Sequence, residues 1–282
     1  MTLESRYLRA LKCPVCGAGM QEDVTCGAGQ LFCRGARRHT FDKARSGYAH
    51  LAPRHSGGGD ARDAVRARTA FLSAGYYAAA SDALCDLLLA SVDEGLVVDA
   101  GCGEGYYTNR LVQAGGERYD VCGFDLSRDA VDAAAKAARR QGIKASYAVA
   151  SIFELPLRDG AADALVNVFA PCAETEFCRV LRPGGVLIVV GAGERHLWGL
   201  KQALYDQTYQ NAERADLPLD MKLIGQRTVE SQIEVVGREQ IMNLFSMTPY
   251  YWRTSPDDRR KLDGLETLKT EISFDCRVYA KK

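Results

Sequence analysis

The chain has 282 residues, of which 47% are hydrophobic and 26% charged. This composition is typical of a globular protein with ample material for a core, and it excludes a disordered or fibrous chain. No apolar run approaches the ~18 residues that span a membrane, and the N-terminus lacks the basic-then-apolar order of a signal peptide. We therefore expect a cytoplasmic protein with no membrane partner.

The 36 basic and 36 acidic residues cancel, but they are unevenly distributed along the chain. Residues 1–69 carry an excess of six positive charges, and the remainder carries an excess of six negative charges. This distribution suits a part that binds phosphates beside a part that performs chemistry, although a solvated surface would have the same pattern.

A glycine-rich segment at 54–63 interrupts the apolar pattern with three consecutive glycines, which predicts a flexible joint. We therefore expect two domains, residues 1–56 and residues 57–282. The first has few aliphatic residues, so it needs a metal or a partner surface for stability.

Four of the ten cysteines cluster near the N-terminus, and without a secretion signal we expect free or metal-bound thiols. Cys13 and Cys16 form a Cys-x-x-Cys pair, whose spacing lets two thiolates face one tetrahedral ion. We predict that Cys33 and His39 complete a zinc site. Cys26 also lies in the window and would replace His39 or Cys33 in an alternative site; free thiols in a turn are the other interpretation.

The rest of the chain alternates short apolar runs with longer periodic segments. Apolar spacing from Ala64 to about Ala90 predicts two helices broken at Gly75-Tyr76-Tyr77. The βαβα order that follows predicts an α/β fold with a Rossmann-like, doubly wound, mostly parallel sheet. The predicted strands are Leu96–Val98, Tyr119–Phe124, Ala145–Val149, Ala164–Phe169 and Val186–Val190. The predicted C-terminal elements are helices around Arg238–Phe245 and Asp257–Leu268 and a strand at Ile272–Tyr279.

A glycine-rich turn, Asp99-Ala100-Gly101-Cys102-Gly103-Glu104-Gly105, joins the first of these strands to a helix. Small residues let the backbone approach a ligand, and the helix N-terminus offers free N–H groups. Twenty positions later, Asp125 ends the next strand, where an acid can bind ribose hydroxyls. With Leu181-Arg182-Pro183-Gly184-Gly185 before the fifth strand, residues 95–190 resemble the class I S-adenosylmethionine-dependent methyltransferases.

This resemblance implies that the glycine loop holds the methionine part of the cofactor and that Asp125 holds its ribose. The adenine side would be formed at Ser151 and Ile152, where Ser151 replaces the acid that many members carry. The residues to which the class assigns the cofactor are Asp99, Gly101, Gly103, Glu104, Asp125, Ser151 and Ile152. Asn167 and Phe169 follow the fourth strand, where methyl acceptors dock in this class.

Motifs outside residues 95–190 extend the resemblance over nearly the whole chain. With the segments Gly101–Thr108 and Phe169-Ala170-Pro171-Cys172 inside that range, they are Cys13-Pro14-Val15-Cys16, Cys33 with His39-Thr40-Phe41-Asp42, Gly47-Tyr48-Ala49-His50-Leu51, Phe71–Tyr77, Arg195-His196-Leu197 and Met247–Trp252. Together these segments resemble the RlmA-type 23S ribosomal RNA guanine-N1-methyltransferases. One departure is that five residues separate Cys33 from His39, where the compared members have Cys-x-x-x-His.

The family resemblance implies methyl transfer from S-adenosylmethionine to N1 of a guanine in a hairpin of 23S ribosomal RNA. It also implies that Tyr77 and His196 border the cofactor; from the residues alone, core packing is the commoner role for both. The acceptor must leave its base pair. We expect Phe169 or Trp252 to stack on it and Asn167 to orient it, and no residue is identified as a general base.

In this interpretation residues 1–56 are a zinc-binding RNA-recognition domain and residues 57–282 the methyltransferase domain. The residues expected to bind RNA are Arg34, Arg37, Arg38, Lys43 and Arg45. Two alternatives stay open: a small-molecule methyltransferase and a non-catalytic zinc-bearing nucleic-acid-binding protein. The target guanine, a homodimeric state and the macrolide resistance associated with some relatives also stay open.

Overall fold

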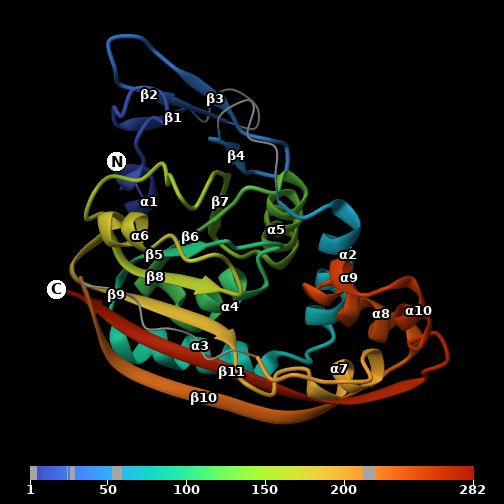
Figure 1. The fold of residues 1–282 in the computed structure, drawn as a ribbon. Helices are drawn as coiled ribbons and strands as arrows, with labels where there is room; N and C mark the ends of the chain where they lie inside the picture. The colour runs from blue at the N-terminus through green and yellow to red at the C-terminus, as the bar shows by residue number, and fades with distance from the viewer. Residues whose placement is uncertain (1–4, 24, 26–28, 53–58, 212–219) are drawn as a thin grey trace.

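The computed structural model describes residues 5–23, 25, 29–52, 59–211 and 220–282. A small antiparallel sheet, ordered β1-β2-β3, lies above a large eight-stranded sheet ordered β10-β11-β9-β8-β5-β6-β7-β4 (Figure 1). No helix among these residues is both long enough and apolar enough to cross a lipid bilayer. The predicted α/β class is confirmed.

The small sheet consists of β1 (Met20–Asp23), β2 (Gln30–Cys33) and β3 (Thr40–Asp42). The strands of the large sheet are β4 (Ala49–His50), β5 (Gly95–Ala100), β6 (Tyr119–Asp125), β7 (Ala145–Val149), β8 (Ala162–Val168), β9 (Leu181–Ala192), β10 (Met221–Val236) and β11 (Thr267–Lys281). The helices are α1 (Arg6–Ala10), α2 (Arg62–Ser73), α3 (Ala78–Ser91), α4 (Tyr106–Gly115), α5 (Arg128–Gln141), α6 (Glu174–Val180), α7 (Trp198–Leu204), α8 (Arg238–Ser246), α9 (Tyr250–Arg253) and α10 (Pro256–Arg260), with a short 3-10 turn at Gly116–Arg118.

Strands β4 to β9 are parallel, and every residue of β5 is buried. Parallel strands need crossover connections, and the helices between them cover both faces of the sheet (Figure 1). The strand order reverses at β5, which has β6 on one side and β8 on the other. A doubly wound sheet binds ligands at such a reversal, beyond the carboxyl ends of its strands.

The five predicted central strands are confirmed, and β8 ends one residue early because Phe169 takes a left-handed backbone with φ of 52°. One prediction near the C-terminus differs from the structure, and one strand there was not predicted. The helix expected at Asp257–Leu268 is the short α10, because the chain turns and enters β11 at Thr267. Strand β10 was missed because this edge strand is largely exposed and polar and lacks a buried strand's apolar run.

The N-terminal residues pack on the large sheet rather than forming a core of their own. Tyr7 and Leu11 are buried in one cluster with Leu96 and Phe124 of the large sheet. The backbone N–H of Tyr7 donates to Asp120 Oδ2 at 3.0 Å. The large sheet therefore supplies apolar surface that the N-terminal residues, with few aliphatic side chains of their own, lack.

The predicted joint at 54–63 is described only in part. Residues 54–58, and with them the proposed boundary between 56 and 57, lie outside the described residues. Asp60 contacts the N-terminal end of α5, because its carbonyl accepts a hydrogen bond at 2.8 Å from Oγ of Ser127, the N-cap residue of that helix. Helix α2 then begins at Arg62.

Candidate active site and metal centre

The glycine loop between β5 and α4 lies at the reversal of strand order. Gly101, Gly103 and Gly105 have φ values of 88°, 54° and 80°, a left-handed backbone that glycine adopts without strain. A Cβ on Gly101 would overlap the Cβ of Ala170, which follows β8. The first glycine therefore permits close contact between this loop and the segment after β8.

Two acidic side chains of the loop are buried. Asp99 is 1% exposed, and its Oδ2 accepts a hydrogen bond from Thr108 Oγ1 at 2.6 Å, whereas Oδ1 has no hydrogen-bond partner among the described residues. Burial raises the pKa of Asp99 to about 7 and that of Glu104 to about 7. Such a pair of desolvated carboxyl groups is suited to a cationic ligand.

Asp125 at the end of β6 faces the same loop. Its Oδ2 accepts from the Gly103 N–H at 3.0 Å, and its Oδ1 accepts from the Ser127 N–H at 2.8 Å. The Ala150 N–H donates to the Asp125 carbonyl at 3.1 Å, which brings the predicted Ser151–Ile152 segment next to this acid. The structure thus assembles the predicted loop, ribose and adenine residues at one edge of the sheet.

Arg68 on α2 reaches the loop, and sequence analysis missed it. Its Nη1 lies 3.7 Å from Glu104 Oε2, and its Nη2 forms an ion pair with Asp60. A Cβ on Gly103 would lie 3.5 Å from Arg68 Nη1, so the guanidinium passes over the loop backbone. The basic residue precedes the glycine motif by more than thirty positions, and no local pattern in the sequence connects the two.

A cluster of rings borders the segment after β8. The Tyr77 hydroxyl lies 3.1 Å from His196 Nε2, and both side chains are buried. The ring of Phe169, which is 47% exposed, lies 5.6 Å from that of His196 and 5.7 Å from that of Phe274. The predicted residues Tyr77, Phe169 and His196 are therefore neighbours, although they come from three distant parts of the chain.

Asn167 in β8 connects this cluster to the glycine loop. It is completely buried, and its Nδ2 donates to the carbonyl oxygens of Ala100 at 3.0 Å and Pro171 at 3.1 Å. Its Oδ1 has no hydrogen-bond partner among the described residues. The amide therefore fixes the 169–171 turn against the end of β5 and leaves one acceptor atom unused.

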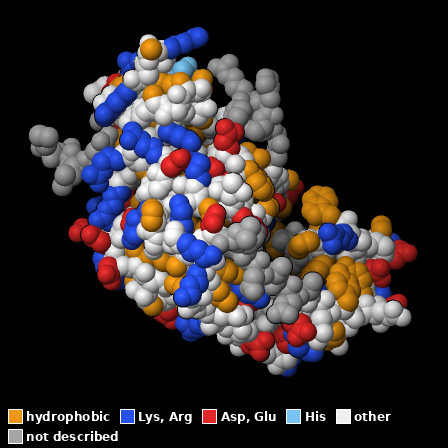
Figure 2. Space-filling model, turned by 60° about the vertical axis from the view of Figure 1, so that its left-hand side comes forward, with side chains coloured by type: hydrophobic (Ala, Val, Ile, Leu, Met, Phe, Trp, Pro, Cys, Tyr) orange, Lys and Arg blue, Asp and Glu red, His pale blue; other side chains and the backbone are white. Residues whose placement is uncertain are grey.

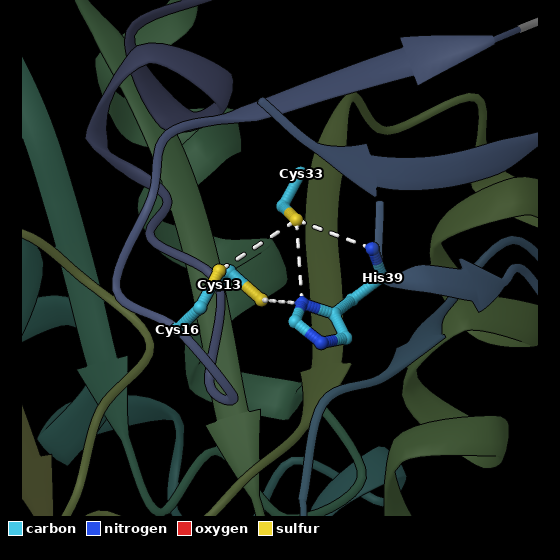
Figure 3. A group of neighbouring side chains, drawn as sticks. All are labelled: Cys13, Cys16, Cys33 and His39. Carbon is cyan, nitrogen blue, oxygen red and sulfur yellow. Dashed lines mark hydrogen bonds between the residues drawn. The ribbon is translucent and has the colours of Figure 1, made fainter. Parts of the chain in front are cut away.

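Cys13, Cys16, Cys33 and His39 point toward one another in the N-terminal module (Figure 3). Their ligand atoms all lie within 4.8 Å of one another. The Sγ atoms of Cys16 and Cys33 are 3.7 Å apart, and His39 Nδ1 lies 3.4 Å from Cys33 Sγ and 3.6 Å from Cys13 Sγ. The predicted four-residue cluster is present in the fold, and the alternative ligand Cys26 lies outside the described residues.

These separations match the edges of a tetrahedron around zinc. Zn–S bonds of about 2.3 Å and a Zn–N bond of about 2.0 Å place two sulfurs about 3.8 Å apart and a sulfur and nitrogen about 3.5 Å apart. Hydrogen bonds from backbone N–H groups, that of His39 foremost, lower the pKa of the Cys33 thiol to about 6. The four side chains therefore fit a tetrahedral metal ion.

The basic residues of the module differ in their surroundings. Arg34, Arg37 and Arg38 are exposed, and the guanidinium of Arg38 lies 4.0 Å from the centre of the Phe32 ring. Lys43 forms an ion pair of 2.5 Å with Glu22. Figure 2 shows Lys and Arg side chains from this upper part of the molecule down one side of the visible face.

The strand reversal, the glycine loop and the acid at the end of β6 define a class I S-adenosylmethionine-dependent methyltransferase. Residues 97–185 match the family described as a methyltransferase domain. The chain is 33% identical over 291 residues to the 23S rRNA (guanine(748)-N(1))-methyltransferase of Streptomyces fradiae, covering 98% of this chain and 99% of that protein. The chain belongs to the family of 23S rRNA (guanine-N1)-methyltransferases.

Two further relatives differ in how much of the chain they match. A Micromonospora griseorubida protein, provisionally named as a 23S rRNA (guanine-N(1)-)-methyltransferase, is 33% identical and covers 87% of this chain and 88% of its own length. A malonyl-[acyl-carrier protein] O-methyltransferase of Hahella chejuensis is also 33% identical, but covers only 38% of this chain and 40% of its own length. The near-complete match is therefore with the ribosomal RNA enzymes.

Proposed function

We propose that this protein transfers the methyl group of S-adenosylmethionine to N1 of a guanine in a hairpin of 23S ribosomal RNA. The observation that carries the proposal is the match to the Streptomyces fradiae enzyme over 98% of the chain, N-terminal module included. A small-molecule methyltransferase would not need that module, and a non-catalytic binder would not need the intact glycine loop and Asp125.

The acidic loop fits the charge of the cofactor. S-adenosylmethionine supplies a methyl group on a positively charged sulfur and carries an ammonium and a carboxylate. Asp99 and Glu104 would face the ammonium, Asp125 would accept hydrogen bonds from the ribose hydroxyls, and Arg68 would bind the carboxylate. Tyr77 and His196 would border the methionine part, and the 151–152 segment the adenine.

The acceptor base would enter beside Phe169. An exposed ring in a strained backbone at the rim of the site can stack on an unpaired guanine, and Trp252 on α9, which is 75% exposed, offers a second ring. Asn167 acts as a positioning residue, since its amide N–H groups hold the turn that carries Phe169. The protein's contribution is then orientation, with the guanine N1 proton lost to solvent as the N1–methyl bond forms.

The cluster Cys13, Cys16, Cys33 and His39 would bind one structural Zn²⁺. All four ligand positions are filled by protein, which is typical of structural rather than catalytic zinc. The ion would hold the loop after α1 against β2 and β3, and thereby position the exposed Arg34, Arg37 and Arg38 for RNA phosphates.

Neutralising the three arginines together tests this role. Arg34→Gln, Arg37→Gln and Arg38→Gln should weaken RNA binding and reduce the slope of affinity against salt concentration by up to about three, because each lost phosphate contact removes about one. The affinity for S-adenosylmethionine should not change. An unchanged RNA affinity would refute this role.

The decisive experiment is methylation of unmodified 23S RNA with labelled cofactor, followed by mapping of reverse-transcription stops, because N1 methylation blocks base pairing. A new stop at one hairpin guanine supports the proposal and identifies the target. Label in a small molecule but not in RNA supports the small-molecule alternative, and cofactor binding without transfer supports the non-catalytic one.

A cytoplasmic location, a homodimer and an effect on macrolide susceptibility are further proposals from the family resemblance. Sedimentation of the purified protein tests the homodimer. The effect on macrolide susceptibility is tested by comparing the minimum inhibitory concentration of macrolides in hosts with and without the gene. Fractionation of the native host tests the cytoplasmic location.

A further inference from the structure

A groove of about 980 Å³ lies between residues 44–48 of the N-terminal module and helix α5. Among the described residues, its lining includes five cationic side chains, Arg45 from the module and four from α5, and the acids Asp60, Asp129 and Asp132. The four cations of α5 are Arg128, Lys136, Arg139 and Arg140. None of these α5 residues was assigned a role by the sequence.

The two walls of the groove are joined by three polar contacts. Ser46 Oγ donates to Asp132 Oδ1 at 2.7 Å, and Arg128 Nε donates to the Tyr48 hydroxyl at 3.1 Å. Arg139 Nη1 donates to the carbonyl of Arg45 at 3.1 Å. These contacts hold the two walls at a defined separation, so the groove is part of the folded structure.

Two of the three acids are already compensated. Asp132 accepts from Lys136 Nζ at 2.6 Å as well as from Ser46, and Asp60 forms an ion pair with Arg68. The charge that remains in the groove is positive, since Asp129 offsets only one of Arg45, Arg128, Arg139 and Arg140. A positive, solvent-accessible groove between two rigid walls attracts a polyanion.

The cations of α5 follow one side of the helix. One face of α5 carries positions 128, 132, 136 and 140, which are four residues apart. Three of them are cations, and the fourth is Asp132, whose charge is paired with Lys136. From 128 to 140 the helix rises about 18 Å, enough to follow several phosphates of one nucleic-acid strand. A small anion such as free phosphate would use only one of these positions.

One end of the groove reaches the candidate cofactor site. Ser127 lines the groove, and its N–H donates to Asp125 Oδ1 at 2.8 Å. Asp60 lines it too, and its partner Arg68 extends over the glycine loop toward Glu104. A strand that lies in the groove is therefore directed toward the edge of the sheet where the methyl donor would bind.

We propose that this groove is a second RNA-binding surface, in which α5 binds the sugar-phosphate backbone of the strand that leads to the target guanine. The proposal rests on the proposed function and extends it from the metal module to the large sheet. It assigns contacts to phosphates rather than bases, because the lining offers cations and no exposed aromatic side chain among the described residues.

The test replaces Lys136 and Arg140, which reach the groove from one face of α5 and make no hydrogen bond with the described residues of the module. We expect Lys136→Gln with Arg140→Gln to weaken binding of an unmodified 23S RNA fragment at least fivefold in low salt. The slope of log affinity against log salt should fall by about one to two, because the charge of Lys136 is shared with Asp132. KM for RNA should rise while kcat at saturating RNA is retained.

The matched control is Lys222→Gln with Lys269→Gln, which removes the same charge from β10 and β11 at the opposite edge of the sheet. These substitutions should leave RNA affinity and salt slope unchanged. Cofactor affinity, metal content and Tm should be those of the unaltered protein in both variants. Hydrogen exchange of residues 128–141 should slow when RNA binds and not when inorganic phosphate is added.

Two results separate the failure of this proposal from that of the proposed function. If the unaltered enzyme methylates the fragment and the α5 variant binds RNA as tightly, with no protection of 128–141, the groove is not an RNA surface and the proposed function stands. If the unaltered enzyme neither binds nor methylates the fragment, both are overturned. The groove proposal is also overturned if a protein or a vesicle, and not RNA, slows the hydrogen exchange of residues 128–141.

Discussion

The hydroxyl of Tyr77 lies 3.1 Å from Nε2 of His196, and the N–H of Ser273 donates to Nδ1 of the same ring at 3.2 Å. Because Nδ1 accepts a hydrogen bond, the ring proton resides on Nε2 and is donated to the tyrosine oxygen. Burial lowers the pKa of His196 to about 3, so the ring is neutral near pH 7. Tyr77 and His196 therefore form a fixed, uncharged contact between the start of α3 and the segment after β9.

Removing the tyrosine hydroxyl should destabilise the protein. Tyr77→Phe leaves the Nε2–H of His196 buried without a partner, which costs about 1–3 kcal/mol of unfolding free energy. Cofactor affinity should fall as well, because His196 loses its fixed orientation. Chemical denaturation and calorimetric titration with S-adenosylmethionine measure the two effects.

Tyr107→Phe is the matched control for this loss. The Tyr107 hydroxyl is buried and has no hydrogen-bond partner among the described residues. Its removal should be neutral or slightly stabilising. Equal destabilisation by the two substitutions would show that the Tyr77 hydrogen bond has no special role.

Cofactor binding should weaken as the pH falls from 8 to 6. The pKa values of Asp99 and Glu104 are each raised by burial to about 7, so both carboxyl groups take up protons in this range. Protonation removes the negative charges that face the ammonium of S-adenosylmethionine, and we expect Kd to rise about tenfold over this interval. Titration calorimetry at each pH measures it, and a Kd independent of pH would contradict the assignment.

Asp99→Asn should separate stability from binding. A folded-state pKa above the reference value of 3.8 means that stability from the bound proton is present at low pH and is lost as the pH rises through about 7. The amide stays neutral, so the variant should have a higher Tm than the unaltered protein at pH 8 and a similar one at pH 4. Its cofactor affinity should be lower and less dependent on pH.

Loss of one metal ligand should release zinc and loosen the N-terminal module. Cys33→Ser should reduce bound zinc from one ion per chain to none, lower Tm and weaken RNA binding, while cofactor affinity at the distant loop is retained. Elemental analysis of the purified protein gives the stoichiometry. Cys178→Ala, outside the cluster, should keep the metal, whereas loss of zinc in Cys26→Ala would favour the alternative ligand.

Arg68 should recognise the carboxylate of the cofactor. We expect Arg68→Met to weaken S-adenosylmethionine binding about tenfold or more, since a charge-assisted hydrogen bond contributes about 1.5–3 kcal/mol. Binding of decarboxylated S-adenosylmethionine should change little in the same variant. Arg66→Met, also on α2 but directed to exposed Asp63, is the control. An equal loss for both ligands would show that Arg68 only compensates Glu104 and Asp60.

The sequence alone was sufficient for the central sheet and for residues that act through local backbone geometry. The glycine loop, Asp125 and the Cys-x-x-Cys pair have fixed spacing, because a turn, a strand end and a tetrahedral ion each constrain neighbouring positions. The strands β5 to β9 were predictable because buried parallel strands require continuous apolar runs. Strand β10 has no such run, so its place was not visible in the sequence.

Only the tertiary structure decided which distant side chains meet. Arg68 reaches the glycine loop because α2 packs beside it, and the groove along α5 exists because residues 44–48 dock on that helix. The local spacing of residues in the sequence predicts the backbone conformation and burial of a segment. The position of a charged side chain in space depends on how distant segments pack together. For that reason the sequence determined the class of enzyme and its candidate metal ligands, and packing determined which charged side chains lie near the proposed cofactor and RNA sites.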